Sequence, residues 1–330
     1  MPGDNIFSRI FWVARGSGDI FSRHVPSTRY SAVIPAQSLG GNVVAYDTDT
    51  GSPGQFLERH APRMIILTKA FDHGFPDLAR EAKARNIPAM ATAVDWHFDK
   101  QFNHELFATV DKIVAQTQAM ADAVEQHIGR TPVIIEEPYE GNRYRPRFRP
   151  KGGLRLLWYG SNNNLDGLAQ ALPPILASQG HHFQLHVVAE TARRAHEVLS
   201  RLPAATGTST IDVDIEEWSE AAQSRALEQC DIVLIPSALT KEKKVKGHNR
   251  LVTAIHAGRL ALAFPLPQYQ ELQDFCWCGE SMLEGILWAL NNQQEAQVRV
   301  EEGQQYIDGR FSPEVIASRW ADEIMSLLPT

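Results

Sequence analysis

The alternation of short apolar runs with longer amphipathic segments constrains the fold of this chain most strongly. Mostly apolar runs recur at Asn42–Tyr46, Met64–Thr68 and Ala89–Ala93, and a segment with helical spacing, Phe75–Arg85, lies between two of them. Strands that alternate with helices form βαβ units, because a parallel neighbour strand needs a long crossover connection. The pattern therefore predicts an α/β fold with parallel sheets.

This alternation occurs twice, and a basic segment separates the two rounds. The segment EGNRYRPRFRPKGG has no periodicity, two prolines and five basic residues, which is typical of a linker. A length of 330 residues is comfortable for two domains. We therefore predict an N-terminal Rossmann-like domain over 1–140, a linker over 141–153, a second Rossmann-like domain over 154–310, and a final helix over 311–330 that crosses back to the first domain.

Composition narrows the class of protein. The chain is 43% hydrophobic and 22% charged, as soluble globular proteins are, and its formal charge of -7 argues against a nucleic-acid partner. No apolar run approaches the ~20 residues of a membrane span, and the N-terminus lacks the pattern of a signal peptide. Three cysteines form neither a disulfide framework nor a metal-binding pattern. We expect a cytoplasmic protein, with at most peripheral contact with a membrane.

Two segments of the second half follow predicted strands, where ligands of parallel sheets bind. The first is the small polar turn Gly160, Ser161 and Asn162, which is suited to phosphate; an ordinary turn with a helix cap explains it as well. The second follows the apolar strand DIVLIPS and concentrates positive charge before a helix, which suits a diphosphate. A solvated surface loop is the alternative for this second segment. Its basic residues are Lys241, Lys243, Lys244, Lys246 and Arg250.

These motifs together resemble a known family. LRLLWYGS, LHVVAE, CDIVLIPS, KGHNR, AIHAG and RLALAFP follow one another as in the donor domain of GT-B glycosyltransferases, especially the large retaining group with many bacterial polysaccharide enzymes. The tail QQYIDGRFSPEVIASRWADEI is similar to the closing helix of that family, and the first half matches more loosely. The resemblance implies two Rossmann-like parallel-sheet domains facing a cleft, with an acceptor-side first domain and a nucleotide-sugar donor domain second.

The resemblance also implies donor-binding residues. Asn249 and Arg250 stand at the family's Asn-Lys/Arg position, where Arg250, helped by Lys243 or Lys246, neutralises the phosphates of the leaving nucleotide. The chain departs from the family at two glutamates eight residues apart, whose places hold Val245 and Thr253. The Thr253 hydroxyl is a weaker partner than a carboxylate for a donor hydroxyl group.

Acceptor-side candidates follow a strand of the first half. Asp95 and His97 follow AMATAV, and a carboxylate or an imidazole there is suited to remove the proton of an acceptor hydroxyl, with Asp95 as the first candidate and His97 as the second. The alternative is that Asp95 caps a helix while Trp96 and Phe98 pack beneath it. Arg29 is a candidate for binding an anionic group of the acceptor or of the donor, or a surface residue.

We expect no cofactor and no metal, because the basic residues replace the metal in this family. Asp47-Thr48-Asp49 and Asp212-Val213-Asp214 have the form of metal-binding triplets, which also arise by chance. The sequence thus predicts a metal-independent transfer of sugar from a nucleotide-sugar to a hydroxyl of a glycan, lipid-linked or protein acceptor. There are two alternatives: an epimerase, and a non-catalytic subunit of GT-B fold that binds a partner. The loss of the two family glutamates favours the non-catalytic subunit.

Overall fold

The computed structural model describes residues 5–16, 26–47, 49, 51–150, 153–202 and 207–329. The chain forms two compact units. Unit 1 comprises Met1–Pro138, Lys244–Gly247 and Phe311–Thr330, and unit 2 comprises Tyr139–Lys243 and His248–Arg310. The first boundary lies close to the expected residue 140, but the chain also returns to unit 1 for the short segment Lys244–Gly247.

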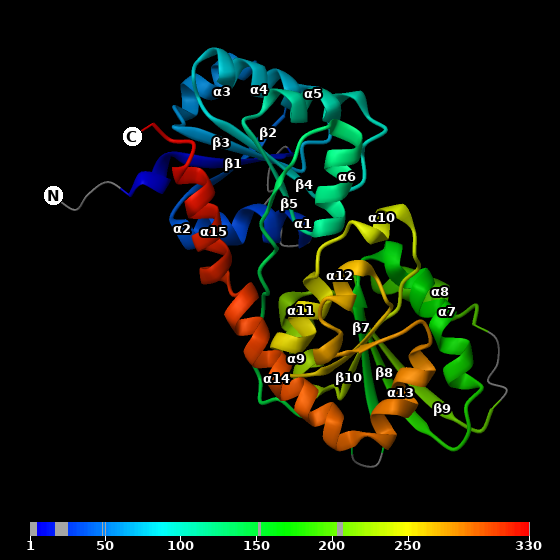
Figure 1. Cartoon of the computed structure of the whole chain (residues 1–330). Coiled ribbons are helices and arrows are strands. Elements are labelled where there is room, and N and C mark those ends of the chain that lie inside the picture. The colour runs from blue at the N-terminus through cyan, green and yellow to red at the C-terminus, as the bar shows by residue number, and fades with distance from the viewer. Residues whose placement is uncertain are drawn as a thin grey trace. The chain divides into compact units, whose positions relative to one another are not determined.

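Unit 1 contains a six-stranded parallel sheet in the order β2-β1-β3-β4-β5-β6 (Figure 1). Its strands are β1 Ile10–Arg15, β2 Asn42–Tyr46, β3 Met64–Thr68, β4 Ala89–Ala93, β5 Lys112–Ala115 and β6 Val133–Ile134. Its helices are η1 Ile6–Arg9, α1 Pro26–Thr28, η2 Arg29–Val33, α2 Ile34–Leu39, α3 Pro53–His60, α4 Gly74–Ala84, α5 Gln101–Thr109, α6 Gln118–Ile128 and α15 Pro313–Met325.

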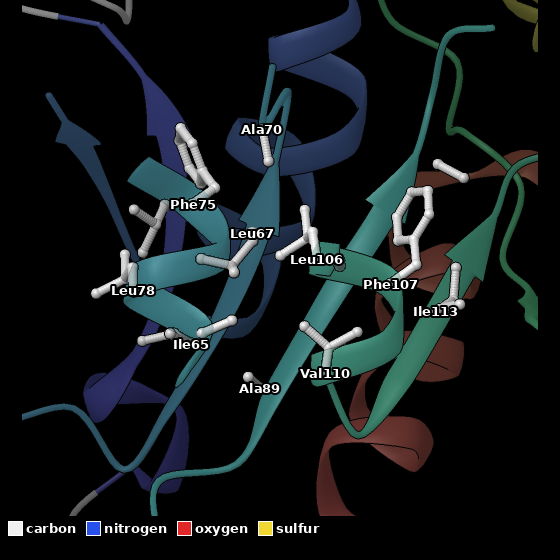
Figure 2. Packing of buried hydrophobic residues seen from close by; sticks show 14 of the residues in the cluster. Ile65, Leu67, Ala70, Phe75, Leu78, Ala89, Leu106, Phe107, Val110 and Ile113 are labelled. Atoms are coloured by element: carbon white, nitrogen blue, oxygen red, sulfur yellow. The ribbon is translucent and has the colours of Figure 1, made fainter. Parts of the chain in front are cut away.

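Both faces of this sheet are covered, as parallel sheets require. Ile65 and Leu67 of β3 point to the face on which Phe75 and Leu78 of α4 pack (Figure 2). The opposite face packs against η2, α2 and α15, where the rings of Trp12 and Trp320 meet edge to face. Consecutive residues of β3 thus alternate between two cores, and this explains why the strand is apolar from Met64 to Leu67.

Unit 2 contains a second six-stranded parallel sheet in the order β12-β11-β10-β7-β8-β9. Its strands are β7 Leu154–Gly160, β8 His182–Ala189, β9 Thr210–Glu217, β10 Ile232–Ile235, β11 Leu260–Ala263 and β12 Trp277–Cys278. The helices that follow them are η4 Asn162–Asn164, α7 Leu165–Leu176, α8 Ala192–Leu199, α9 Glu220–Gln229, α10 Lys241–Lys244, α11 Asn249–His256, α12 Pro267–Gln270, η5 Gln273–Phe275, α13 Met282–Asn291 and α14 Gln293–Phe311.

The expected linker is packed on unit 2. The Phe148 side chain is buried in the core of that unit, and the backbone N–H of Arg147 donates to the carbonyl oxygen of Gly258 at 3.2 Å. Gly258 has φ +69°, a left-handed conformation that favours glycine. A methyl group there would lie 2.8 Å from the Cα of Pro146. The basic segment therefore approaches the helix-to-strand turn through a close contact that only glycine permits.

Candidate functional site

The strand order of unit 2 indicates a candidate ligand site. Counted from β7, the sheet runs outward in one direction through β8 and β9 and in the other through β10, β11 and β12. The order reverses between β7 and β10, and ligands of open parallel sheets bind at the carboxyl ends of the strands at such a point. Gly160 ends β7 there, and α7 begins so close to the segment after β10 that a methyl group on Gly167 would lie 3.2 Å from the Pro236 carbonyl oxygen.

Three polar side-chain atoms near the start of α11 lack a partner. Among the described residues, Asn249 Oδ1, Arg250 Nη1 and Thr253 Oγ1 are buried without a hydrogen bond. Buried polar groups are normally paired, because an unmade hydrogen bond costs about 1–3 kcal/mol. Donors and an acceptor left open beside the positive end of a helix suit a polar, anionic ligand.

Contacts from strand β7 and helix α12 hold Arg250 in place. The Tyr159 hydroxyl donates to the Arg250 carbonyl oxygen at 2.9 Å, and the Arg250 guanidinium forms a hydrogen bond with the buried Tyr269 hydroxyl. Burial raises the pKa of both tyrosines, so each remains a neutral hydroxyl. A methyl group on Gly160 would lie 3.5 Å from Arg250 Nη1, so the guanidinium reaches the end of β7. Sequence reasoning missed Tyr159 and Tyr269 because neither the apolar run of β7 nor the short segment PQYQ of α12 carries a signal for such contacts.

The small polar turn after β7 is tied to neighbouring segments. Ser161 Oγ accepts from the Asn164 side chain at 2.9 Å, and the Lys243 ammonium donates to Asn164 Oδ1. The backbone N–H of Asn162 donates to the Glu190 carboxylate at 3.1 Å. The structure thus brings Gly160, Ser161 and Asn162 together with Lys243 across the carboxyl ends of β7 and β8. Glu190, which sequence reasoning did not single out, lies at the same edge.

Two residues of the basic segment, Val245 and Lys246, belong to unit 1 rather than to unit 2. Val245 is buried in the hydrophobic core of unit 1, and the Lys246 ammonium donates to the Asp95 carboxylate of the same unit. Thr253, by contrast, stays in unit 2, where it is 1% exposed. Of the residues expected to bind the donor, the structure therefore groups all but Lys246 in unit 2.

Asp95 of unit 1 forms an ion-pair network with two lysines. Its Oδ2 accepts from Lys69 Nζ at 2.7 Å, and its Oδ1 accepts from Lys246. Burial opposes ionisation of this carboxyl group, but the two ammonium groups outweigh it and lower the pKa of Asp95. Helix α5 begins at Gln101 with Lys100 as its cap residue, so Asp95 does not cap that helix. The packing expected of Phe98 is present, because its ring is buried and stacks on His127.

His97 lies beside this network. Its ring packs edge to face on Phe71, with ring centroids 4.5 Å apart. Burial lowers the pKa of His97 below its ordinary 6.5, and the charges of Lys69 and Lys246 act in the same direction, opposed by Asp95 and Asp99. The imidazole is therefore neutral at pH 7, and a neutral imidazole is able to accept a proton.

Arg29 is buried rather than a surface residue, with an exposed fraction of 7%. It begins the π-helix η2, and Ser31 of the same helix forms a 2.8 Å hydrogen bond with the Thr68 hydroxyl at the end of β3. Thr68 in turn accepts from the Thr92 hydroxyl of β4 at 2.9 Å. Helix η2 is thereby fixed at the carboxyl ends of β3 and β4, the strands that Lys69 and Asp95 follow.

Of the two aspartate triplets, only the second lies entirely within the described residues. Thr48 of the first triplet lies outside the described residues. Asp212 and Asp214 of the second lie on the edge strand β9, where their carboxylates approach His182 and His186 at 3.6 Å each. Within the described ranges no group of three or more His, Cys, Asp or Glu side chains is arranged to hold a metal ion, and no helix is long and apolar enough to cross a membrane.

Comparison with known proteins gives matches at the level of structure. No family model and no curated relative matches the chain. HepE of Anabaena in complex with UDP-glucose matches with a TM-score of 0.64 and 14% identity, over 96% of this chain and 99% of that chain. A UDP-forming alpha,alpha-trehalose-phosphate synthase from Burkholderia vietnamiensis matches with a TM-score of 0.63 and 11% identity, over 97% and 99% of the two chains.

AviGT4, a glycosyltransferase involved in avilamycin A biosynthesis, matches with a TM-score of 0.60 and 13% identity, over 96% of this chain and 98% of that chain. The proteins matched are GT-B glycosyltransferases. The fold expected from the motifs of the second half is thus confirmed, and this chain has the GT-B fold.

Proposed function

We propose that this protein transfers a sugar from a nucleotide-sugar to a hydroxyl group of a glycan, lipid-linked or protein acceptor, without a bound metal. The observation that carries the proposal is the set of buried, unpaired polar atoms of Asn249, Arg250 and Thr253 at the reversal point of the unit 2 sheet. The solved structures of HepE with UDP and with UDP-glucose support the choice of donor class.

Arg250 supplies the chemistry at the donor. The acceptor oxygen forms a bond to the anomeric carbon while the bond from that carbon to the diphosphate oxygen breaks. Negative charge then accumulates on the departing nucleoside diphosphate. A guanidinium held in place by Tyr159 and Tyr269 stabilises that charge without reorganisation during the reaction. Lys243 adds a second positive charge at the same edge, and Asn249 and Thr253 bind polar groups of the donor.

At the acceptor, His97 is the better proton acceptor. Asp95 is occupied by two ammonium groups that stabilise its charged form, which makes it a weak base. The neutral imidazole of His97 takes the proton of the acceptor hydroxyl as the new glycosidic bond forms. Asp95 then acts as a positioning residue that fixes the lysines beside the imidazole.

A panel of UDP-, GDP-, CMP- and TDP-sugars tests the donor class by thermal shift, because a ligand of the native state raises the melting temperature. One nucleotide should stabilise the protein clearly above the others, and no stabilisation by any of them would remove the proposal. Turnover should persist in excess chelator, since Arg250 and Lys243 carry the charge. Loss of turnover that added divalent metal restores would contradict metal independence.

A non-catalytic role is the second candidate, because Val245 and Thr253 replace the two carboxylates of the family pattern. Val245 is buried in an apolar core, where a charged group would be costly. The test is an assay of sugar transfer to glycan and lipid-linked acceptors and of hydrolysis of the nucleotide-sugar. If the protein binds one nucleotide-sugar but shows neither transfer nor hydrolysis, the result supports the non-catalytic role.

A further inference from the structure

We propose that the acceptor of this enzyme carries a phosphate group and that Lys69, held by Asp95 together with Lys246, binds that group on unit 1. The inference rests on the proposed glycosyl transfer and adds the chemical class of the acceptor. Lys69 was not among the residues singled out from the sequence, although it directly follows the apolar run of β3.

The three side chains of the Lys69–Asp95–Lys246 network carry a net positive charge. One carboxylate neutralises one of the two ammonium groups, so the three side chains together carry a net charge of +1. Each ammonium has three N–H donors and uses one on Asp95. The Lys69 and Lys246 side chains are 21% and 43% exposed, against 15% for Asp95. The two lysine side chains are thus the more exposed part of the network, the part that an anion can reach, although Lys69 Nζ also lies 5.0 Å from the centroid of the Phe71 ring.

The backbone at Lys69 supports a role in binding. Its φ is +51°, in the left-handed region that a non-glycine residue adopts at an energetic cost. A lysine there presents its ammonium to Asp95 from the end of β3, one strand away from the end of β4. Strain of this kind collects at sites that position a ligand group.

Neighbouring residues fix the segments around Lys69 and Asp95. The hydroxyl chain Ser31–Thr68–Thr92 fixes η2, which begins with the buried Arg29, at the ends of β3 and β4. His97 lies within the electrostatic reach of both lysines. A phosphate bound at Lys69 would therefore lie within the electrostatic reach of the proposed base.

The imidazole of His97 reports on such a phosphate. Its proton affinity responds to the charges of Lys69, Lys246, Asp95 and Asp99, so a bound dianion should raise the His97 pKa. The probe is inorganic phosphate, titrated into the full chain and followed by NMR of the histidine side chains, with chloride at equal ionic strength as reference. Arg250→Ala serves as the background, because it removes the main phosphate ligand of unit 2.

In this background, phosphate should raise the His97 pKa. Lys69→Gln should weaken phosphate binding about ten- to a hundredfold, as expected for the loss of one charge-assisted contact. Lys69→Arg should retain phosphate binding, because arginine keeps the positive charge. Lys83→Gln, an exposed lysine of α4 in the same unit, is the matched control and should behave as the background does. Thermal melting of each variant shows that the fold persists.

Two results would overturn the inference. One is a His97 pKa that phosphate leaves unchanged, and the other is an equal response in the Lys69→Gln and Lys83→Gln proteins. If the Lys69–Asp95 ion pair only stabilises the fold and binds no phosphate, one of these two results is expected. The proposed donor site is tested separately by nucleotide-sugar binding to the parent protein. If the nucleotide-sugar binds and phosphate does not, only the class of acceptor is wrong.

Discussion

The Tyr159 hydroxyl at the end of β7 donates a 2.9 Å hydrogen bond to the carbonyl oxygen of Arg250 in the first turn of α11. The bond joins two segments that are 91 residues apart in the chain. It fixes the start of α11 against the strand whose final glycine opens the proposed donor site. The position of the guanidinium is therefore set by the sheet rather than by the loop that precedes the helix.

Tyr159→Phe should weaken nucleotide-sugar binding about two- to tenfold and lower the free energy of unfolding by about 1 kcal/mol, the net value of one such hydrogen bond. Calorimetric binding and urea unfolding measure the two effects. Tyr306→Phe removes the hydroxyl of an exposed tyrosine in the same unit and is the control. Unchanged binding in Tyr159→Phe would show that this hydrogen bond does not position Arg250.

The rate of transfer should depend on pH through His97. A base must be unprotonated, so kcat/KM should be constant near neutral pH and fall as pH decreases through the His97 pKa. Because burial lowers that pKa, the midpoint should lie below 6.5. His97→Gln should reduce turnover about a hundredfold or more with donor affinity unchanged.

Asp95→Asn is the companion variant for this prediction. If Asp95 only positions the lysines, the variant should retain the acidic limb of the pH profile at reduced rate. If Asp95 were the base, the limb would vanish in Asp95→Asn and persist in His97→Gln.

Gly258→Ala should destabilise unit 2 by about 2–5 kcal/mol. The residue would keep the left-handed backbone, which costs about 1–2 kcal/mol, and its methyl group would meet Pro146, which adds about 1–3 kcal/mol of overpacking. Gly180→Ala is the matched control, since Gly180 has φ +74° and nothing within 4 Å of the added methyl group. Urea unfolding of Gly180→Ala should show only the cost of the left-handed backbone, about 1–2 kcal/mol. Equal costs would mean that the contact with Pro146 relaxes freely.

Much of the fold follows from local sequence. Met64–Thr68 and Ala89–Ala93 are predicted as strands with the bounds that the structure has, because each is buried on both faces and therefore mostly apolar. The two-residue strand Trp277–Cys278 and the π-helix Arg29–Val33 carry no comparable signal. Their conformations depend on neighbours far along the chain, such as Ala263 beside Cys278 and Thr68 beside Ser31.

The candidate site is harder to predict for the same reason. Positional reasoning identifies Asp95 and Arg250, since each follows a strand or begins a helix. It does not predict that Lys246, 151 residues from Asp95, binds that carboxylate. That pairing makes Asp95 the ion-pair partner of two lysines, and it depends on three-dimensional contacts that no local pattern encodes.

The central claim is that the start of α11 binds the phosphates of a nucleotide-sugar. Its most direct test is calorimetric binding of UDP and UDP-glucose to the parent, Arg250→Ala and Arg193→Ala proteins. Arg193 is an arginine of the same unit whose side chain is 89% exposed, and its removal should leave binding unchanged. Arg250→Ala should weaken binding about ten- to a hundredfold. Equal affinities of the Arg250→Ala and Arg193→Ala proteins for a nucleotide that binds the parent would contradict the account.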